Sequence, residues 1–347
     1  MDALNLNKQL LTDTVRRLLA DDKGLLAMDE STATCNRRFG ALDIPTTAAY
    51  RRRYRELIIM TPALSECISG AILFDETIRQ QKDDGTAFTK TLLDAGIMVG
   101  IKVDMGAVPL ACFPGEKITE GLDGLRGRLA EYFEMGARFA KWRAVIAIGN
   151  GMPSQYCIDA NAHALARYAA LCQEAGLVPV VEPEVLMEGD HTMAKCAEVT
   201  EKVLRSVFIE LNKHNVLPEG MLLKPNMVLP GNDCPQQENI NEVADATMNV
   251  FLRTVPAAVP GILFLSGGQS PALASQRLNA MHTRFRWRIP WAVSFSFSRA
   301  IQQPALEIWM GKDDNVKAAQ QALYHRAACN KAACREEYNS LMEKTRS

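Results

Sequence analysis

Short apolar runs recur along the chain, each of a length that suits one buried strand. The eight runs are Gly24–Met28, Ile68–Phe74, Met98–Val103, Phe139–Val145, Val178–Val185, Met221–Val228, Ile262–Leu265 and Trp291–Phe297. They follow one another at intervals of about 30 to 40 residues, the length of one strand, one loop and one helix in a repeated βα unit. Eight parallel units of this kind close into a barrel. The pattern therefore predicts an α/β protein with the (β/α)8 TIM-barrel fold.

The segments between these runs have helical features. Leu122, Leu125 and Leu129 follow the 3.6-residue period, and Asn161–Glu174 is rich in alanine. Further helices are predicted over Met193–Lys213, Glu242–Val255 and, near the end of the chain, Asn315–Lys344. No low-complexity linker divides the sequence. We therefore expect residues 1–347 to form a single barrel domain with an N-terminal helix and a C-terminal helical tail.

Polar and charged residues interrupt four consecutive apolar runs at positions i and i+2. Side chains at alternate positions of a strand point to one face, and the C-terminal strand ends of a barrel carry its catalytic groups. A structural ion network is the alternative, but burying many ions is costly and rarely stabilises a fold, so we favour a reaction centre. The pairs are Lys102 and Asp104, Lys141 and Arg143, Glu182 and Glu184, and Lys224 and Asn226, with Asp29 after the first run.

Two lysines among carboxylates suit catalysis by an amine nucleophile. A lysine attacks a carbonyl only when it is neutral, and an unperturbed lysine, with a pKa of about 10.4, is almost fully charged at pH 7. A second ammonium and an apolar environment both disfavour that charge, so Lys141 is placed to activate Lys224. Glu182 is then the candidate to protonate the departing carbinolamine hydroxyl. Asp29 is the candidate to accept a hydroxyl proton while a carbon–carbon bond breaks.

Composition narrows the possible functions. The net charge of −1 gives no global field that would attract nucleic acid or an anionic membrane. The first residues lack the pattern of a secretory signal, and no eighteen apolar residues run together. The nine cysteines show no paired spacing and suit reduced thiols. We therefore expect a cytoplasmic protein that binds neither nucleic acid nor a membrane.

No metal or organic cofactor is predicted. The five histidines show no i,i+4 pairing and none lies in a predicted strand, so a zinc-dependent route lacks its usual ligands. His191, just after the fifth apolar run, is the one histidine that the pattern places near the mouth of the barrel.

Two cationic segments indicate sites for phosphate. Ser266-Gly267-Gly268 follows the seventh run, where barrels of this kind habitually bind phosphate, and Arg299 follows the eighth. A glycine pair lets backbone N–H groups approach an anion, and arginine offers a bidentate cation. Arg37-Arg38 follows the first run, so the substrate is expected to carry two phosphates. A further cationic stretch, Arg51–Arg55, is interpreted as a solvated helix face.

The segments that carry these residues resemble one known family, the class I fructose-1,6-bisphosphate aldolases, which act through a lysine Schiff base. The resemblance follows the chain in order over nearly its whole length, and six segments matching together make it specific. They are Leu26–Thr32, Val99–Asp104, Phe139–Arg143, Val181–Glu184, Leu222–Met227 and Leu265–Ser270.

The resemblance implies a role for each candidate residue. The catalytic set would be Lys224 as the Schiff-base nucleophile, Lys141 and Glu182 as its proton-transfer and electrostatic partners, Asp29 as a catalytic carboxylate and Glu184 as an orienting residue. One phosphate would bind Ser266, Gly267, Gly268 and Arg299, and the other end of the site would be lined by Lys102, Arg143, Thr34, Arg37 and Arg38.

The chain departs from the family pattern at a few positions. Arg37 and Met105 stand where many members have lysine, and Ser298 stands where they have glycine. Animal members end in a tail with a terminal tyrosine that assists proton transfer. This chain ends in Ser347, and its nearest tyrosine, Tyr338, is expected within the last helix.

The implied activity is the reversible cleavage of fructose 1,6-bisphosphate to dihydroxyacetone phosphate and glyceraldehyde 3-phosphate, a step of glycolysis and gluconeogenesis. Three alternatives stay open at this point. They are an aldolase that also accepts sedoheptulose 1,7-bisphosphate, a transaldolase-like Schiff-base barrel with one phosphate site, and a protein retained as a binding or scaffold module. A homotetramer is expected by analogy with the family alone.

Overall fold

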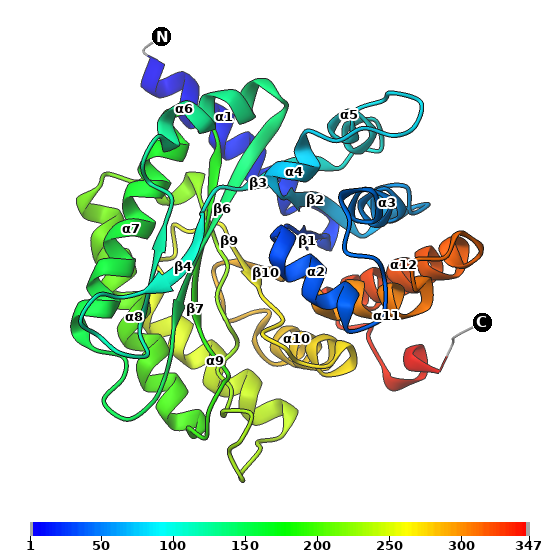
Figure 1. Ribbon diagram of the computed structural model, residues 1–347. Helices are drawn as coiled ribbons and strands as arrows, with labels where there is room; N and C mark the ends of the chain where they lie inside the picture. Colours follow the sequence, from blue (N-terminus) through cyan, green and yellow to red (C-terminus); the bar gives the residue numbers. More distant parts are fainter. Residues whose placement is uncertain (1–2, 345–347) are drawn as a thin grey trace.

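The structure is a computed structural model that describes residues 3–344, with side chains from Asn7 onward. Eight parallel strands form a closed barrel in the order β1-β10-β9-β8-β7-β6-β3-β2, so the predicted (β/α)8 fold is confirmed (Figure 1). The first and last strands pair with each other and close the barrel. The strands of the barrel are β1 Gly24–Met28, β2 Ile68–Leu73, β3 Met98–Lys102, β6 Ala137–Ile146, β7 Val178–Val185, β8 Leu222–Leu223, β9 Gly261–Phe264 and β10 Ala292–Phe297.

The strands differ from the prediction in two places. The predicted run Met221–Val228 contains only the two-residue strand β8, because the chain leaves the sheet after Leu223, and Lys224 therefore follows directly on the strand end. A two-stranded antiparallel hairpin, β4 Gly106–Pro109 with β5 Lys117–Glu120, lies outside the barrel and was not predicted. Its strands are only four residues long and partly exposed, which leaves no apolar run to detect.

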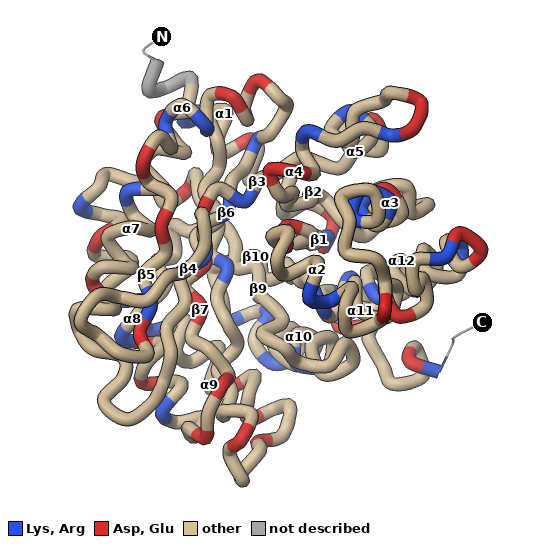
Figure 2. Tube along the Cα trace, in the orientation of Figure 1, with Lys and Arg blue, Asp and Glu red and all other residues tan. Residues whose placement is uncertain are grey.

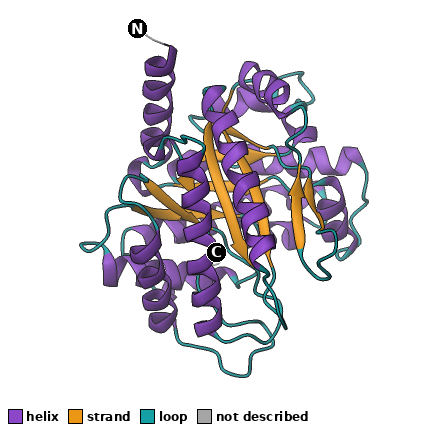
Figure 3. Cartoon of the chain, turned by 90° about the vertical axis from the view of Figure 1, so that its left-hand side faces the viewer, coloured by secondary structure: helices purple, strands orange, loops and turns teal. Residues whose placement is uncertain are grey.

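Helices surround the barrel as an outer layer (Figure 3). Each of the helices predicted between runs is present, and α8 has the predicted bounds. The helices are α1 Ala3–Leu18, α2 Thr32–Gly40, α3 Ala48–Ile59, α4 Asp75–Ile78, α5 Phe88–Asp94, α6 Leu125–Glu134, α7 Gln155–Glu174, α8 Met193–Lys213, α9 Ile240–Thr254, α10 Pro271–Phe285, α11 Arg299–Trp309 and α12 Val316–Cys334.

The C-terminal segment is not one long helix. α12 ends at Cys334, and only a short 3-10 helix, Ser340–Glu343, follows, so the prediction of a helix to Lys344 is wrong. Tyr338 lies between the two helices instead of inside one, and its hydroxyl donates to Glu343 Oε1 at 2.7 Å. Arg326 on α12 binds both oxygens of the same carboxylate at 2.6 and 2.7 Å. The bonds from Arg326 tie the tail to α12.

The interior of the barrel is apolar below its mouth. One hydrophobic cluster joins the inward side chains of the strands, such as Leu25, Val180 and Leu222, to Leu11 and Leu18 of α1. α1 thereby covers the end of the barrel where the strands begin, and its last residue is also held by a hydrogen bond from Ser69 Oγ on β2. The charged groups of the ion-paired interior lie at the opposite end, where the strands finish.

Phe139 fills the centre of this apolar floor. Its ring is fully buried and lies over Gly100 of β3, where a Cβ atom would overlap the ring, and it also borders Gly70 of β2. Phe139 precedes Lys141 by two residues on the same face of β6, so the ring lies directly beneath that lysine. Glycine at position 100 therefore makes room for the side chain that supports the site.

Charges of both signs are spread over the whole chain, in agreement with its net charge of −1 (Figure 2). Within residues 3–344, no helix is both long enough and apolar enough to span a membrane.

We predict that Gly100→Ala destabilises the fold, because the new methyl group must displace the buried Phe139 ring. The expected loss is about 1 to 3 kcal/mol, as for other overpacked cores, and thermal unfolding would measure it. Gly127→Ala on α6 is the matched control, because nothing lies within 4 Å of its added Cβ atom. The control should be neutral or slightly stabilising. An equal effect of the two substitutions would contradict the packing role of Gly100.

Candidate active site

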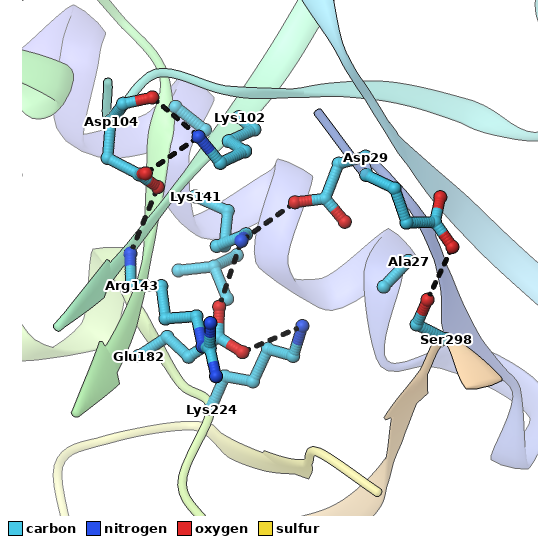
Figure 4. Close-up of polar contacts among 12 residues, drawn as sticks. Ala27, Asp29, Lys102, Asp104, Lys141, Arg143, Glu182, Lys224 and Ser298 are labelled. Carbon is cyan, nitrogen blue, oxygen red and sulfur yellow. Dashed lines mark hydrogen bonds and ion pairs between the residues drawn. The ribbon is translucent and has the colours of Figure 1, made fainter. Parts of the chain in front are cut away.

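Four buried charged side chains meet at the mouth of the barrel (Figure 4). Lys141 Nζ lies 2.7 Å from Asp29 Oδ2 and 3.1 Å from Glu182 Oε2. The other oxygen of Glu182, Oε1, lies 3.2 Å from Lys224 Nζ. The two lysines and two carboxylates, which we call the ion cluster, thus form one connected chain of opposite charges, in which Glu182 bridges both lysines.

The ion cluster is almost fully buried, and its charged groups shift one another's pKa values. Burial alone would raise the pKa of Asp29, but the ammonium charges of Lys141 and Lys224 lower it to about 2. Burial would likewise raise the pKa of Glu182, but the charges of the same two lysines lower it. Burial acts to lower the pKa of Lys141, and the carboxylates of Asp29 and Glu182 overcome it and raise that pKa. Both carboxylates and Lys141 are therefore charged at pH 7.

The register of the strands brings these groups together. Lys102 of β3 lies opposite Lys141 of β6, and Arg143 of β6 lies opposite Glu182 of β7. Lys224 comes at the first position after β8, which neighbours β7. Four adjacent strand ends, those of β3, β6, β7 and β8, thus place charges at matching heights around the mouth, as the i and i+2 spacing predicts.

A second pair of cations lies at the rim. Lys102 Nζ binds Asp104 Oδ1 at 2.7 Å, and the guanidinium of Arg143 pairs with Glu184. Asp104 also accepts a hydrogen bond from the backbone N–H of Arg143 at 3.2 Å, which joins the two pairs. The side chains of Lys102 and Arg143 are 14% and 43% exposed, so a ligand that enters the mouth can reach them.

Asn226 was expected on the same face as Lys224, and this prediction is wrong. Its Oδ1 accepts a hydrogen bond from the N–H of Val185 at 2.9 Å, and its Nδ2 donates to the carbonyl of Met227 at 3.0 Å. Because the chain leaves the sheet after β8, strand alternation no longer applies at this position. Asn226 fastens the end of β7 to the loop after β8 instead of facing the ion cluster.

His191 lies in the loop after β7, where its carbonyl accepts a hydrogen bond from the N–H of Gly231 at 2.7 Å. Burial of the ring lowers the pKa of His191, so the ring is neutral at pH 7. It packs in this loop and is not a member of the ion cluster.

The glycine loop and the arginine predicted to bind one phosphate lie side by side. Gly267 and Gly268 have φ angles of +55° and +86°, which side chains rarely permit. A Cβ atom on Gly268 would lie 3.2 Å from Arg299 Nη2, so the guanidinium rests against this backbone. Ser266 is buried at the start of the loop, and Arg299 is exposed at the start of α11. The predicted arrangement of these four residues is therefore present.

Three of the five residues expected at the other phosphate, Thr34, Arg37 and Arg38, lie together on α2, the helix after β1. Ser31 caps this helix, and its hydroxyl accepts a hydrogen bond from the N–H of Thr34 at 3.3 Å and donates to Thr34 Oγ1 at 3.2 Å. Arg37 is exposed, whereas Arg38 is partly buried and pairs with Glu30. Arg37 is thus the more accessible of the two cations for a ligand, whereas Arg38 also forms an ion pair within the fold.

Glu30, the neighbour of Asp29, is the centre of a buried polar network. It pairs with Arg38 and, at 2.7 Å, with Arg55. It also accepts hydrogen bonds of 2.9 Å from Ser298 Oγ and from Gln302 Nε2. Burial would raise the pKa of Glu30, and the two arginines lower it instead. Ser298, which departs from the glycine of the family pattern, therefore links the end of β10 to the end of β1.

The arginines of α3 do not form the solvated face that was predicted. Arg51 and Arg55 are buried, and Arg51 forms a two-pronged ion pair with Glu76 at 2.7 and 2.8 Å. Only Arg52 and Arg53 on this helix pair with exposed acids. Two arginines of this basic run can be buried because each forms an ion pair with a glutamate from another part of the chain.

Ser296 was missed by the sequence analysis. It lies on β10 opposite the inward residue Leu25 of β1, it is 1% exposed, and its hydroxyl has no hydrogen-bond partner among the described residues. The signal was present in Ser294-Phe295-Ser296-Phe297-Ser298, where serine alternates with phenylalanine so that the hydroxyls share one face. We add Ser296 to the candidate site residues.

This arrangement can carry out carbonyl chemistry on a phosphorylated compound. Lys224 offers an amine to a carbonyl carbon, and Glu182 lies within reach of a proton on that amine. The glycine loop with Arg299 can hold a phosphate at a fixed place beside them. The fold and site thus define a barrel enzyme of the kind that forms an imine between a lysine and its substrate.

Comparisons with known proteins identify the family. The family model described as fructose-bisphosphate aldolase class-I matches residues 10–347, so the chain belongs to that family. It is 56% identical over 322 residues to a probable fructose-bisphosphate aldolase class 1 of Xanthomonas campestris pv. campestris. This match covers 92% of this chain and 96% of the relative. It is 49% identical to fructose-bisphosphate aldolase B of Gallus gallus, over 95% of this chain and 91% of the relative.

A solved structure agrees with these relatives. The fructose-bisphosphate aldolase of Plasmodium falciparum, in complex with TRAP and a small molecule inhibitor, superimposes with a TM-score of 0.94. The two are 44% identical, and the match covers 96% of each chain. The expected class I aldolase, a carbon–carbon lyase that works through a Schiff base, is confirmed, and the transaldolase-like alternative is set aside.

We predict that Lys141→Met destabilises the protein most at neutral pH. Asp29 and Glu182 have lowered pKa values, so their stabilising contribution is present above their unfolded pKa values of about 4 and is lost as the pH falls. Without Lys141 these carboxylates are poorly compensated, at a cost on the order of 3 to 5 kcal/mol. Protonation relieves that cost, so the gap to the wild type should shrink between pH 7 and pH 4.

Thermal unfolding across this pH range measures the gap. Lys195→Met is the control, because Lys195 pairs with Glu198 on the exposed face of α8. This control should change stability little at any pH. A gap for Lys141→Met that does not depend on pH would show that the ion cluster does not set the charge of its carboxylates.

Proposed function

We propose that Lys224 is the nucleophile that forms the Schiff base and that Glu182 moves the protons this step requires. The observation that carries the proposal is the position of Glu182 Oε1, 3.2 Å from Lys224 Nζ. Glu182 accepts a proton from the Lys224 ammonium, and the neutral amine then attacks the substrate ketone. The proton returns from Glu182 to the carbinolamine hydroxyl, which leaves as water and yields the iminium.

The shared carboxylate couples these two proton transfers. While Lys224 is charged, Glu182 is held ionised between two ammonium groups. When Lys224 becomes neutral, one of these cations is lost, and protonated Glu182 is favoured. When the iminium forms, the positive charge returns and Glu182 releases its proton. Lys141 keeps its charge throughout, since its pKa is raised, and it holds Glu182 and Asp29 in position.

Asp29 is the base for cleavage of the carbon–carbon bond in this proposal. Its low pKa of about 2 keeps it ionised, and its Oδ2 is held by Lys141 at 2.7 Å. Asp29 accepts the proton of the substrate hydroxyl next to the bond that breaks, and the iminium accepts the electron pair as an enamine. Glu184 orients Arg143 at the rim through their ion pair.

The two phosphates of the substrate bind at opposite ends of the site in this proposal. Ser266, Gly267, Gly268 and Arg299 hold the phosphate of the ketone half, and Lys102, Arg143, Thr34, Arg37 and Arg38 line the end that receives the other. This division agrees with the class of substrate, a phosphorylated sugar, and favours fructose 1,6-bisphosphate. A preference between it and sedoheptulose 1,7-bisphosphate stays open, because both substrates share these two ends.

We also propose that the protein acts in the cytoplasm. A relative in Arabidopsis thaliana, 51% identical over 90% of this chain, is named a cytosolic fructose-bisphosphate aldolase. A homotetramer stays a prediction.

Borohydride added during turnover with dihydroxyacetone phosphate should convert the imine into a stable secondary amine on Lys224. Peptide mass spectrometry locates the adduct, and Lys224→Arg should prevent it. Lys141, which lies in the same ion cluster, is the internal control and should stay unmodified, since its raised pKa keeps it charged. An adduct on Lys141 or on another lysine would contradict the mechanism.

Substitutions of Arg299 and Arg143 should affect the two phosphate-binding ends of the site separately. Arg299→Ala should weaken both fructose 1,6-bisphosphate and dihydroxyacetone phosphate, because both carry the phosphate of the ketone half. Arg143→Ala should weaken the bisphosphate by about 1.5 to 3 kcal/mol and leave trapping of dihydroxyacetone phosphate nearly unchanged. KM values and single-turnover trapping measure these effects. If Arg143→Ala weakened the binding of both compounds equally, Arg143 would not belong to the end that binds the second phosphate.

A further inference from the structure

Two histidines and a glutamate meet on the outer helices, outside the ion cluster. His163 of α7, Glu210 of α8 and His214, the residue that follows α8, each offer one ligand atom, and these atoms lie within 4.8 Å of one another. We propose that these three side chains form a site for a divalent transition metal ion of the zinc type, which clamps α7 to α8.

The spacing of the donor atoms suits such an ion. Around a tetrahedral zinc ion with bonds of about 2.0 to 2.1 Å, donor atoms lie about 3.3 Å apart. His163 Nδ1 is already 3.4 Å from Glu210 Oε2, and one ligand atom from each of the three side chains lies within 4.8 Å of the others. The imidazole rings are 4.9 Å apart at an interplanar angle of 67°, near the separation of about 5 Å for two imidazoles on one such ion. Small side-chain rotations are enough to close the site.

The surrounding contacts orient two of the ligands. His214 Nδ1 lies 2.9 Å from the backbone carbonyl oxygen of Glu210, so it donates there as N–H and leaves Nε2 with the free electron pair. Metal-binding histidines commonly use their second nitrogen in this way. Lys213 Nζ holds Oε1 of Glu210 at 2.7 Å, which leaves Oε2 turned toward the histidines. Hydrogen bonds thus already prepare a carboxylate and an imidazole as ligands.

The site is open to solution and lies between the helices that follow β6 and β7. The side chains of His163, Glu210 and His214 are 53%, 17% and 22% exposed, so an ion can enter and keep a water ligand. α7 and α8 pack against each other directly behind the strands that carry Lys141 and Glu182. A bound ion would add a cross-link between these two units. Its role is structural, and cleavage of the substrate proceeds without it.

The test is titration of the metal-free protein with Co²⁺ and Zn²⁺. Visible absorption of bound Co²⁺ reports the ligand geometry, calorimetry gives the affinity for Zn²⁺, and thermal unfolding reports stabilisation. Cys112→Ser serves as the background for all variants, because Cys112 is an exposed thiol that could bind these ions. We expect saturable binding of one ion that raises the unfolding temperature, while the aldol cleavage rate stays unchanged.

Single substitutions assign the ligands. His163→Gln, His214→Gln and Glu210→Gln should each weaken Zn²⁺ binding by at least about 10- to 100-fold, the effect of losing even an outer-shell partner, and should abolish the thermal shift. Glu198→Gln, an exposed acid on the same helix, is the matched control and should bind as the parent does. His325→Gln tests the competing pair of His325 with Cys329, whose atoms lie 3.6 Å apart.

Two kinds of outcome would overturn the proposal, an ion bound elsewhere and no bound ion at all. Binding that survives His163→Gln and His214→Gln would place the ion elsewhere, and so would binding that is lost in His325→Gln. Absence of saturable binding at micromolar Zn²⁺ would show that the three side chains do not form a metal site. Aldolase activity should stay normal in every variant. Either outcome would therefore leave the roles proposed for the ion cluster untouched.

Discussion

The ion cluster at the mouth of the barrel is the constraint on which the rest of the structure depends. Two ammonium groups and two carboxylates are buried together, and each would cost several kcal/mol to bury without its partners. Their charges cancel, and every contact is made between different strand ends, Asp29 to Lys141 and Glu182 to both lysines. The cluster therefore depends on a frame that holds these strand ends in place.

The barrel supplies that frame from below. Phe139 fills the space that glycine leaves at position 100, and α1 covers the opposite end of the barrel with Leu11 and Leu18. A dry floor raises the strength of the ion pairs above it, because no water competes for their charges. The same floor directs a substrate to one entrance, where Lys102 and Arg143 stand at the rim.

The sequence predicted well whatever depends on neighbours along the chain. The apolar runs gave the strands of the barrel, and the alternation within them placed Lys141, Glu182 and Lys224 on one inner face. One failure has a different cause, since it involves a partner that is distant in sequence. Arg55 was predicted to be a surface charge because its partner, Glu30, lies in the loop after β1, which is 25 residues away in sequence.

Local exceptions account for the remaining failures. Asn226 was misplaced because β8 stops after two residues, which no periodicity reveals. The long C-terminal helix was expected from its alanine content, but Glu336 adopts a left-handed conformation with φ of +64° just after α12 ends. Ser296 escaped notice because a hydroxyl on an apolar strand is a weaker signal than a charge. Chemistry carried by ions is easier to predict than chemistry carried by neutral groups.

The closure of the barrel has a consequence for how the protein is made. β1 pairs with β10, and the Glu30 network joins the loop after β1 to Ser298 and Gln302, so the beginning of the chain is completed by its last quarter. On the ribosome, the strands from β1 to β9 emerge while both edges of the sheet, β1 and β9, are still unpaired, and such edges favour aggregation. The active site can assemble only after β10 has left the exit tunnel, so an incomplete chain is both inactive and exposed to misassociation.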